Sequence, residues 1–139
     1  MTDATKEELI TLMLKENKTI TKHLEIGLTR LIILWKISKG DIYGYNLMKT
    51  IDEFYRDQIE LGLVKTANPS KIYPILKKME ENELIKGEWE LKNNKNVKVY
   101  KITEKGNHLI EALKDKIATT SLNPKWQEFI HDMTSKVEK

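Results

Sequence analysis

The sequence contains no cysteine among its 139 residues, which excludes disulfides, thiolate metal sites and cysteine nucleophiles. It also has no long hydrophobic run: the longest, Leu31–Trp35, is far below the roughly 18 apolar residues that indicate a membrane-spanning helix. The first residues lack the basic region, apolar stretch and cleavage site of a signal peptide. We therefore expect a cytoplasmic protein with no membrane partner.

Arginine is scarce, since only Arg30 and Arg56 occur, and lysine supplies nearly all the positive charge. The formal net charge is only +3, but residues 65–101 contain nine Lys against five Glu. A basic middle third of this kind suits a polyanionic partner, although a solvated lysine-rich surface has the same composition. Both interpretations stay open on charge alone.

Motifs for catalysis and metal binding are missing as well. His23, His108 and His131 lie far apart, and the nearest additional ligands are carboxylates that any charged helix supplies. No Gly-rich phosphate loop occurs, and no Ser lies in a nucleophile motif. We expect no metal, no cofactor and no enzymatic activity.

With 40% hydrophobic residues the chain can form a core, and its length fits one domain. Thr5, Thr21, Asn68 and Thr103 are suitable N-caps for helices. The second helix is apolar on nearly every side, so we expect it in the middle of the core. From the spacing of apolar residues, helices are predicted at about residues 5–16, 21–37, 42–55, 69–81, 104–117 and 124–137.

Between the fourth and fifth of these helices the apolar period changes to two. Gly87, Trp89 and Leu91 alternate with charged residues, which predicts a strand with one buried face. The polar segment 92–96 predicts a turn, and residues 97–102 predict a returning strand. Together they predict a hairpin with lysines near its tip.

Three helices, a hairpin and a further helix follow the order of a winged helix-turn-helix domain. The expected fold is mainly α with a small β-hairpin, and its N- and C-terminal helices pack as a dimerisation region. We divide the chain into an N-terminal helical extension (1–22), a winged helix-turn-helix DNA-binding domain (23–103) and C-terminal helices (104–139). The helix that starts at Pro69 would enter a major groove about 12 Å wide, and segment 92–96 would be the wing that reaches the flanking backbone.

Three segments resemble a known family, the PadR-type transcriptional regulators. Gly40–Lys49 (GDIYGYNLMK) resembles the Gly-Tyr segment that opens the family's second helix. Asn68–Glu80 (NPSKIYPILKKME) is similar to its recognition-helix signature, including the Tyr-Pro pair, and Val99–Gly106 (VYKITEKG) matches the segment that leaves the wing. The resemblance covers about residues 28–115 and implies a dimeric DNA-binding regulator.

Three positions depart from the family pattern. Family members usually carry a small residue, often Gly, where this chain has Ser70, and a hydroxyl residue where it has Lys71. They also usually place Gly where Glu83 stands, just after the recognition helix. If the backbone there has a positive φ, Glu83 is strained.

The residues expected to contact DNA lie in the recognition helix and the wing. Ser70 and Lys71 have no apolar partners at helical spacing and should face outward. Tyr73 can pack in the core or contact DNA, and Lys77 can contact phosphate or pair with Glu81. Because Lys lacks the planar fork of Arg, we expect mainly electrostatic affinity. The predicted set is Ser70, Lys71, Tyr73, Lys77, Lys95 and Lys98.

The last helix carries an apolar stripe, which we interpret as a dimerisation or domain-packing face. The stripe consists of Trp126, Phe129, Ile130, Met133 and Val137. A two-fold dimer would match two operator half-sites one helical turn apart, and the resemblance implies a dimer as well. Some relatives bind aromatic effectors between dimer helices, and Trp35 or Trp126 would be candidates to line such a pocket, while core packing is the simpler role for each.

We therefore expect a homodimeric transcriptional regulator that reads operator DNA, acts as a repressor and is released by an aromatic or hydrophobic small-molecule effector. The alternative is a winged-helix module that binds protein and not DNA. The two differ in one structural feature. A DNA-binding protein should gather Ser70, Lys71, Lys77, Lys95 and Lys98 on one exposed basic face, whereas Glu residues or a covering segment would interrupt that face in a protein-binding module.

Overall fold

The computed structural model describes residues 3–138, and the side chains of residues 5–136. The described helices are α1 (Asp3–Glu16), α2 (Lys18–Ser38), α3 (Gly44–Phe54), α4 (Arg56–Glu60), α5 (Pro69–Glu81), α6 (Glu104–Ser121), α7 (Pro124–Thr134) and the short 3₁₀ helix η1 (Ser135–Glu138). The strands β1 (Ile42–Tyr43), β2 (Ile85–Lys92) and β3 (Lys95–Ile102) form an antiparallel sheet in the order β1-β3-β2. The predicted fold, mainly α with a small hairpin, is confirmed.

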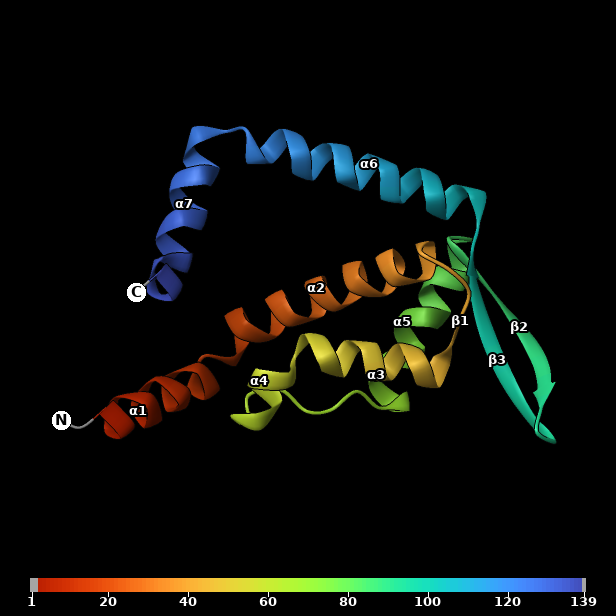
Figure 1. The fold of residues 1–139 in the computed structure, drawn as a ribbon, viewed down its shortest axis with the longest axis horizontal. Coiled ribbons are helices and arrows are strands. Elements are labelled where there is room, and N and C mark those ends of the chain that lie inside the picture. The colour runs from red at the N-terminus through yellow and green to blue at the C-terminus, as the bar shows by residue number, and fades with distance from the viewer. Residues whose placement is uncertain (1–2, 139) are drawn as a thin grey trace.

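The helices α2, α3 and α5 lie together, and the β2–β3 hairpin projects from one end of this group (Figure 1). Above them, α6 runs along α2, and α7 turns back from the far end of α6 toward α1. The core lies where α2, α3, α5 and α6 meet. Its buried residues include Ile33, Leu34, Ile37, Leu47, Ile51, Ile72, Leu76 and Ile110.

A buried tyrosine joins α2 to the end of α3. The Tyr55 hydroxyl donates to the carbonyl oxygen of Glu25 at 3.1 Å and lies 2.9 Å from the Thr29 hydroxyl. Because its single proton goes to Glu25, Thr29 donates in the second bond. Burial raises the pKa of the Tyr55 hydroxyl, so the group stays protonated at neutral pH. These two bonds fix α3 against the N-terminal half of α2.

The start of α5 is specified by its sequence. The Asn68 side chain accepts from the Lys71 amide at 3.0 Å, and Pro69 takes the first helical position. Just before it, the Ala67 amide donates to the Asp52 carboxylate at 2.7 Å, which anchors the preceding loop to α3. The helix therefore begins at Pro69, as predicted.

The end of α5 is a Schellman motif. The Glu83 amide donates to the Glu80 carbonyl oxygen, and the Leu84 amide donates to the Met79 carbonyl oxygen, both at 2.9 Å. Glu83 itself has a φ of 60°, in the left-handed region that favours glycine. The strain anticipated at Glu83 is thus present.

Three helix starts differ from those predicted. The helix α3 begins at Gly44 and not at residue 42, because Ile42 and Tyr43 pair with β3 as the strand β1. The helix α1 begins at Asp3 and α2 begins at Lys18, so Thr5 and Thr21 lie inside helices and are not N-caps. The reason is that Asn17 alone separates the two helices. The Asn17 amide donates to the Met13 carbonyl oxygen at 3.1 Å, which continues the i to i−4 hydrogen bonds of α1. A separate capping segment between the two helices is therefore not required.

Two predictions about burial are wrong. On α2, Leu24 and Leu28 are exposed, and Trp35 stays 38% exposed although its ring meets Phe54 edge to face, because α3 and α6 cover that side of the helix only in part. On β2, Trp89 and Leu91 are exposed, because the hairpin extends beyond the helices that would cover them. The elements β1 and α4 were not predicted, since two and five residues are too short to show a period. No described helix is long and apolar enough to cross a membrane.

Replacing Glu83 with Gly should stabilise the fold, because Gly adopts a positive φ without steric cost. The left-handed conformation costs an L-residue about 1–2 kcal/mol, and the larger entropy of unfolded Gly offsets part of the gain. We expect the free energy of unfolding to rise by roughly 0.5–1 kcal/mol in chemical denaturation. The control Glu81→Gly, in the last turn of α5, should lower it by about as much. Equal effects of the two substitutions would contradict strain at Glu83.

Candidate nucleic-acid interface

The helix α5 presents one polar face to solvent. Ile72, Leu76 and Met79 follow at i, i+4 and i+7 and are buried against the core. Neither Lys77 nor Lys78 forms an ion pair with any side chain in the described range 5–136, so the alternative pairing of Lys77 with Glu81 is not observed. The exposed face carries Ser70, Tyr73, Pro74, Lys77 and Lys78.

Tyr73 packs on a glycine and stays partly exposed. A Cβ at Gly44 would lie 3.4 Å from the ring and hydroxyl of Tyr73 and 3.6 Å from the ring of Tyr100, so Gly44 lets α5 lie close to the start of α3. The side chain of Tyr73 is still 43% exposed. Burial raises the pKa of the neighbouring Tyr100 hydroxyl to about 12, which keeps that group neutral. Tyr73 therefore combines the packing role and the exposed position that the sequence left open.

Lys71 is less exposed than its sequence position suggested. Its Nζ lies 3.1 Å from Glu25 Oε2, and the exposed fractions of the two side chains are 24% and 17%. The same ammonium group lies 5.8 Å from the centre of the Tyr55 ring. Lys71 thus ties the first turn of α5 to α2.

The hairpin ends in a two-residue turn with lysines beside it. Asn93 and Asn94 have φ values of 53° and 63°, as in the type I′ turns that hairpins favour. The turn sets Lys92 directly opposite Lys95, where like charges repel. Lys92 lies 4.5 Å from the centre of the Tyr43 ring. Lys95 is exposed and makes no ion pair or ring contact with the described residues, so its charge is available to an anion.

Lys98 connects the hairpin to α5. Its Nζ lies 3.0 Å from Glu80 Oε1 and 5.6 Å from the centre of the Trp89 ring. Gly87 provides the space for this pair, because a Cβ there would overlap with the Lys98 side chain and approach Glu80 Oε1 to 2.7 Å. The ammonium group of Lys98 is therefore directed toward Glu80 of the same chain and not toward solvent.

The predicted DNA-contact residues thus separate into two groups. Ser70, Tyr73 and Lys77 on α5 and Lys95 at the hairpin tip are exposed. Lys71 and Lys98 lie at the edges of this surface, and each is paired with a Glu. The carboxylates of Glu25 and Glu80 were not predicted, because nothing in the sequence pairs residues so far apart. The close approach of Tyr73 to Gly44 could have been predicted from the Gly-Tyr segment 40–49, because that segment resembles a family motif.

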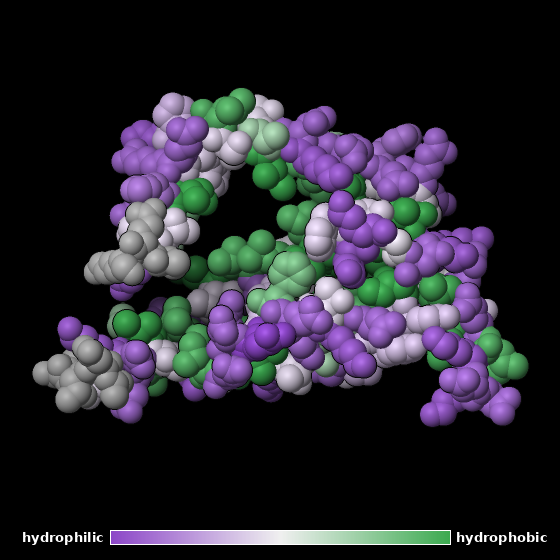
Figure 2. All heavy atoms as spheres, viewed as in Figure 1, coloured by the Kyte–Doolittle hydropathy of each residue, from purple (hydrophilic) through white to green (hydrophobic). Residues whose placement is uncertain are grey.

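The predicted dimerisation residues on α7 are exposed in the single chain. Trp126, Phe129, Ile130 and Met133 all face solvent, and the side chain of Val137 lies outside those that the structure describes. Figure 2 shows a hollow between α7 and the α1–α2 segment, with hydrophobic residues on its margins. On α1, further apolar side chains are exposed: Leu9, Ile10, Leu12, Met13 and Leu14.

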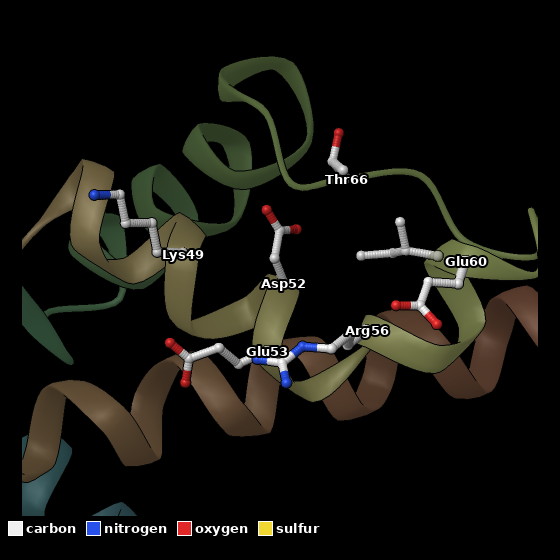
Figure 3. A pocket seen from close by; sticks show the side chains of 7 residues that line it. Lys49, Asp52, Glu53, Arg56, Glu60 and Thr66 are labelled. Carbon is white, nitrogen blue, oxygen red and sulfur yellow. The ribbon is translucent and has the colours of Figure 1, made fainter.

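A polar hollow of about 300 Å³ lies beside α3 and α4 (Figure 3). Both positively and negatively charged side chains line this hollow, and the Asp52 carboxylate already accepts a hydrogen bond from the Ala67 amide. None of the predicted contact residues lines it. It is lined by Lys49, Asp52, Glu53, Arg56, Ile59, Glu60 and Thr66.

An apolar hollow of about 270 Å³ lies between α2, α3 and α6. The rings of Trp35 and Phe54 meet edge to face beside it, with centroids 6.3 Å apart. Lys114 is the charged residue at its edge, and it pairs with Glu111 at 3.1 Å. The other lining residues are Leu31, Ile32, Ile110, Leu113 and Ile117. Within the described part of the chain, no cluster of three or more His, Asp or Glu could hold a metal ion.

Solved structures with the same arrangement are known. A PadR-like transcriptional regulator from Bacillus cereus is 27% identical, with a TM-score of 0.56 over 73% of this chain and 93% of that one. A protein from Thermoplasma acidophilum is 24% identical, with a TM-score of 0.59 over 81% and 96%. A PadR family transcriptional regulator from Eggerthella lenta is 22% identical, with a TM-score of 0.52 over 73% and 79%. These likenesses support the winged-helix fold.

At the level of sequence, no curated protein matches the chain. The family model described as the transcriptional regulator PadR-like family, however, matches residues 33–112, which is more than half of the chain. The match includes α3, α5, the hairpin and most of the residues that hold them together. The chain therefore belongs to the PadR-like family of transcriptional regulators.

Proposed function

We propose that the protein is a cytoplasmic repressor that binds operator DNA as a homodimer, with α5 in the major groove and the hairpin on the flanking backbone. The observation that carries this proposal is the exposed polar face of α5 beside a hairpin with the unpaired Lys95 at its tip. An α-helix fits the major groove, and phosphate contacts from the hairpin would set its orientation. Membership in a family of transcriptional regulators supports the same function.

The six predicted contacts have different roles in this proposal. Lys77 and Lys95 bind phosphates, because they are exposed and unpaired among the described residues. Ser70 and Tyr73 offer hydroxyl groups on the groove-facing side of α5. Lys71 and Lys98 reach DNA only by exchanging Glu25 and Glu80 for phosphate, so their contribution is smaller.

The homodimer in this proposal uses the apolar residues of α7 and α1. A second copy that fills the hollow beside α7 would cover side chains that are otherwise exposed to water. The interface would be isologous, so that two copies of α5 face the same side of the DNA. The division into an extension (1–22), a DNA-binding domain (23–103) and a dimerisation region (104–139) belongs to the same proposal.

The effector in this proposal is an aromatic or hydrophobic small molecule. The apolar hollow between α2, α3 and α6 offers a site of suitable chemistry, with Trp35 in its wall. Because α2 also carries Glu25, which holds Lys71, a ligand that displaces α2 would alter the first turn of α5.

The alternative function, a protein-interaction module, has one observation in its favour. Glu25 and Glu80 interrupt the basic surface at its two edges, as expected for a surface that avoids polyanions. Family membership and the exposed, unpaired Lys77 and Lys95 favour DNA.

Lys77→Ala and Lys95→Ala should each weaken DNA binding uniformly across sequences. In a dimer each substitution removes two phosphate contacts, so the slope of log affinity against log salt should flatten by about two units. Fluorescence anisotropy of labelled upstream DNA at several salt concentrations measures both quantities. Lys116→Ala removes the same charge from an exposed position on α6 and should leave the slope unchanged. An unchanged slope in the first two variants would remove these lysines from the interface.

Glu25→Gln should strengthen DNA binding by the dimer by roughly twofold to thirtyfold, because each of its two Lys71 side chains loses an ion pair worth about 0.2–1 kcal/mol that competes with phosphate. The gain should be absent when Glu25→Gln is added to Lys71→Gln, as measured in the same titration. If the gain persists without Lys71, Glu25 acts through its general negative field and not by holding Lys71.

Met133→Asp should yield monomers in light scattering, because the new charge would be buried in an apolar seam. The exposed position of Met133 in the single chain means that the monomer itself should stay folded. Lys125→Asp, at an exposed position of the same helix, is the control and should remain dimeric. A Met133→Asp dimer of unchanged stability would place the interface elsewhere.

A further inference from the structure

The turn that ends α5 is hydrogen-bonded to the start of α6. Ile85 pairs with Ile102 at the base of the hairpin, which brings residues 82–84 next to residues 103–106, and we call these two segments the α5–α6 junction. Three successive carbonyl oxygens of the turn accept hydrogen bonds across it. The pairs are Lys105 Nζ to Asn82 at 2.9 Å, the Thr103 hydroxyl to Glu83 at 2.6 Å and the Thr103 amide to Leu84 at 3.1 Å.

Thr103 is the centre of the α5–α6 junction. Its hydroxyl oxygen accepts from the Gly106 amide at 3.0 Å, which caps α6. Because a hydroxyl can accept and also has one proton to donate, the same group donates to the Glu83 carbonyl oxygen and joins the two helices. The Leu84 carbonyl oxygen lies 2.9 Å from this hydroxyl as well. Loss of the hydroxyl would therefore weaken both the cap of α6 and the link to α5.

Gly106 and Lys105 strengthen the junction. A Cβ at Gly106 would overlap with the Leu84 carbonyl oxygen, so α6 and the turn meet backbone to backbone. A backbone atom, unlike the end of a flexible side chain, cannot move aside without moving the chain. Lys105 is exposed, and its ammonium group lies at the C-terminal end of α5, where the helix dipole favours a positive charge. The end of α5 thus has little freedom relative to the start of α6.

The rest of α6 is loosely packed. Gly106 and Ile110 are the buried residues of the helix, and both lie in its first two turns. Farther along, the apolar hollow of about 270 Å³ lies between α6 and the helices α2 and α3, and Ile117 is 55% exposed. The direction of α6 is therefore set mainly at the junction.

The length of α6 amplifies any change of angle at the junction. The helix has 18 residues, so at about 1.5 Å per residue it is about 27 Å long. It leads from the junction to α7, which carries the proposed dimer face (Figure 1). A rotation of about 10° at one end of α6 moves its other end by about 5 Å, which exceeds the roughly 3.4 Å between base pairs.

We propose that the α5–α6 junction fixes the separation of the two copies of α5 in the dimer, and with it the spacing of the DNA half-sites that the protein accepts. This proposal rests on the proposed function, since it needs a dimer that reads two half-sites. A two-fold dimer selects half-sites whose separation matches that of its own recognition helices. Thr103 and Lys105 are then positioning residues, which act through the angle between α5 and α6.

The test compares operator duplexes that differ in half-site spacing. The upstream duplex and derivatives with one base pair added or removed between the half-sites are titrated by fluorescence anisotropy. For the wild-type protein, each derivative should bind about tenfold or more weakly, because a displaced half-site loses contacts as a mismatched one does. Thr103→Val removes the hydroxyl at nearly constant volume and should reduce this penalty severalfold, whereas Thr103→Ser should restore it.

Lys105→Ala should reduce the spacing penalty as well, and its exposed position means that the fold should persist if Thr103→Val does not fold. Lys116→Ala is the matched control, because a charge lost outside the junction affects all duplexes equally and leaves the penalty unchanged. An unchanged penalty in Thr103→Val and Lys105→Ala, or equal binding of the wild-type protein to all three duplexes, overturns the inference while the proposed function stands. If the wild-type protein binds none of them, the proposed function itself fails.

A second measurement needs no DNA. Because the chain has no cysteine, Lys78→Cys places a single spin label on the exposed face of each copy of α5. Pulsed electron paramagnetic resonance should find a narrow distribution of distances between the two labels, which Thr103→Val should broaden or shift and Thr103→Ser should preserve. The control label Lys125→Cys on α7 lies beyond the junction, so Thr103→Val should leave its distribution unchanged. An unaltered distribution between the α5 labels in Thr103→Val would overturn the inference, whereas the absence of any distance between labels would contradict the proposed dimer.

Discussion

The close approach of Tyr73 to Gly44 fixes the position of α5, and the surface proposed to bind DNA depends on that position. With hydrogen at Gly44, the ring of Tyr73 can lie across the start of α3 while α5 buries its apolar residues in the core. The two ends of the helix are then held by ion pairs, Lys71 to Glu25 and Lys98 to Glu80. These contacts connect α5 to α2 on one side and to the hairpin on the other.

The same ion pairs limit how much positive charge the surface presents. A lysine that is partly buried beside a carboxylate binds phosphate only after it gives up that partner, so the pairs hold α5 in place at some cost in DNA affinity. The exposed lysines attract phosphate by their charge but do not fix the direction of the contact, because Lys lacks the planar donor fork of Arg. Sequence discrimination in such a protein depends more on hydroxyl contacts and on DNA shape.

Much of this structure could be predicted from interactions between neighbouring residues. The features that could not be predicted depend on contacts between distant segments. Asn68 and Pro69 specify the start of α5 through adjacent atoms, and the hairpin follows from a change of period. Trp89 was expected to be buried because apolar and charged residues alternate along the strand. This alternation shows that the strand has two different faces, but it does not show whether another element covers the apolar one. The pairing of Glu25 with Lys71 has no local signal, since it depends on how α2 packs against α5. The DNA contacts themselves remain predictions.

The surface formed by α5 and the hairpin is proposed to bind a specific DNA sequence. A fluorescence titration of the wild-type protein against its own upstream DNA and against an unrelated duplex, each at several salt concentrations, tests it most directly. We expect tighter binding to the upstream DNA and an affinity that falls steeply with salt for both duplexes. Absence of binding to either duplex at low salt would contradict it.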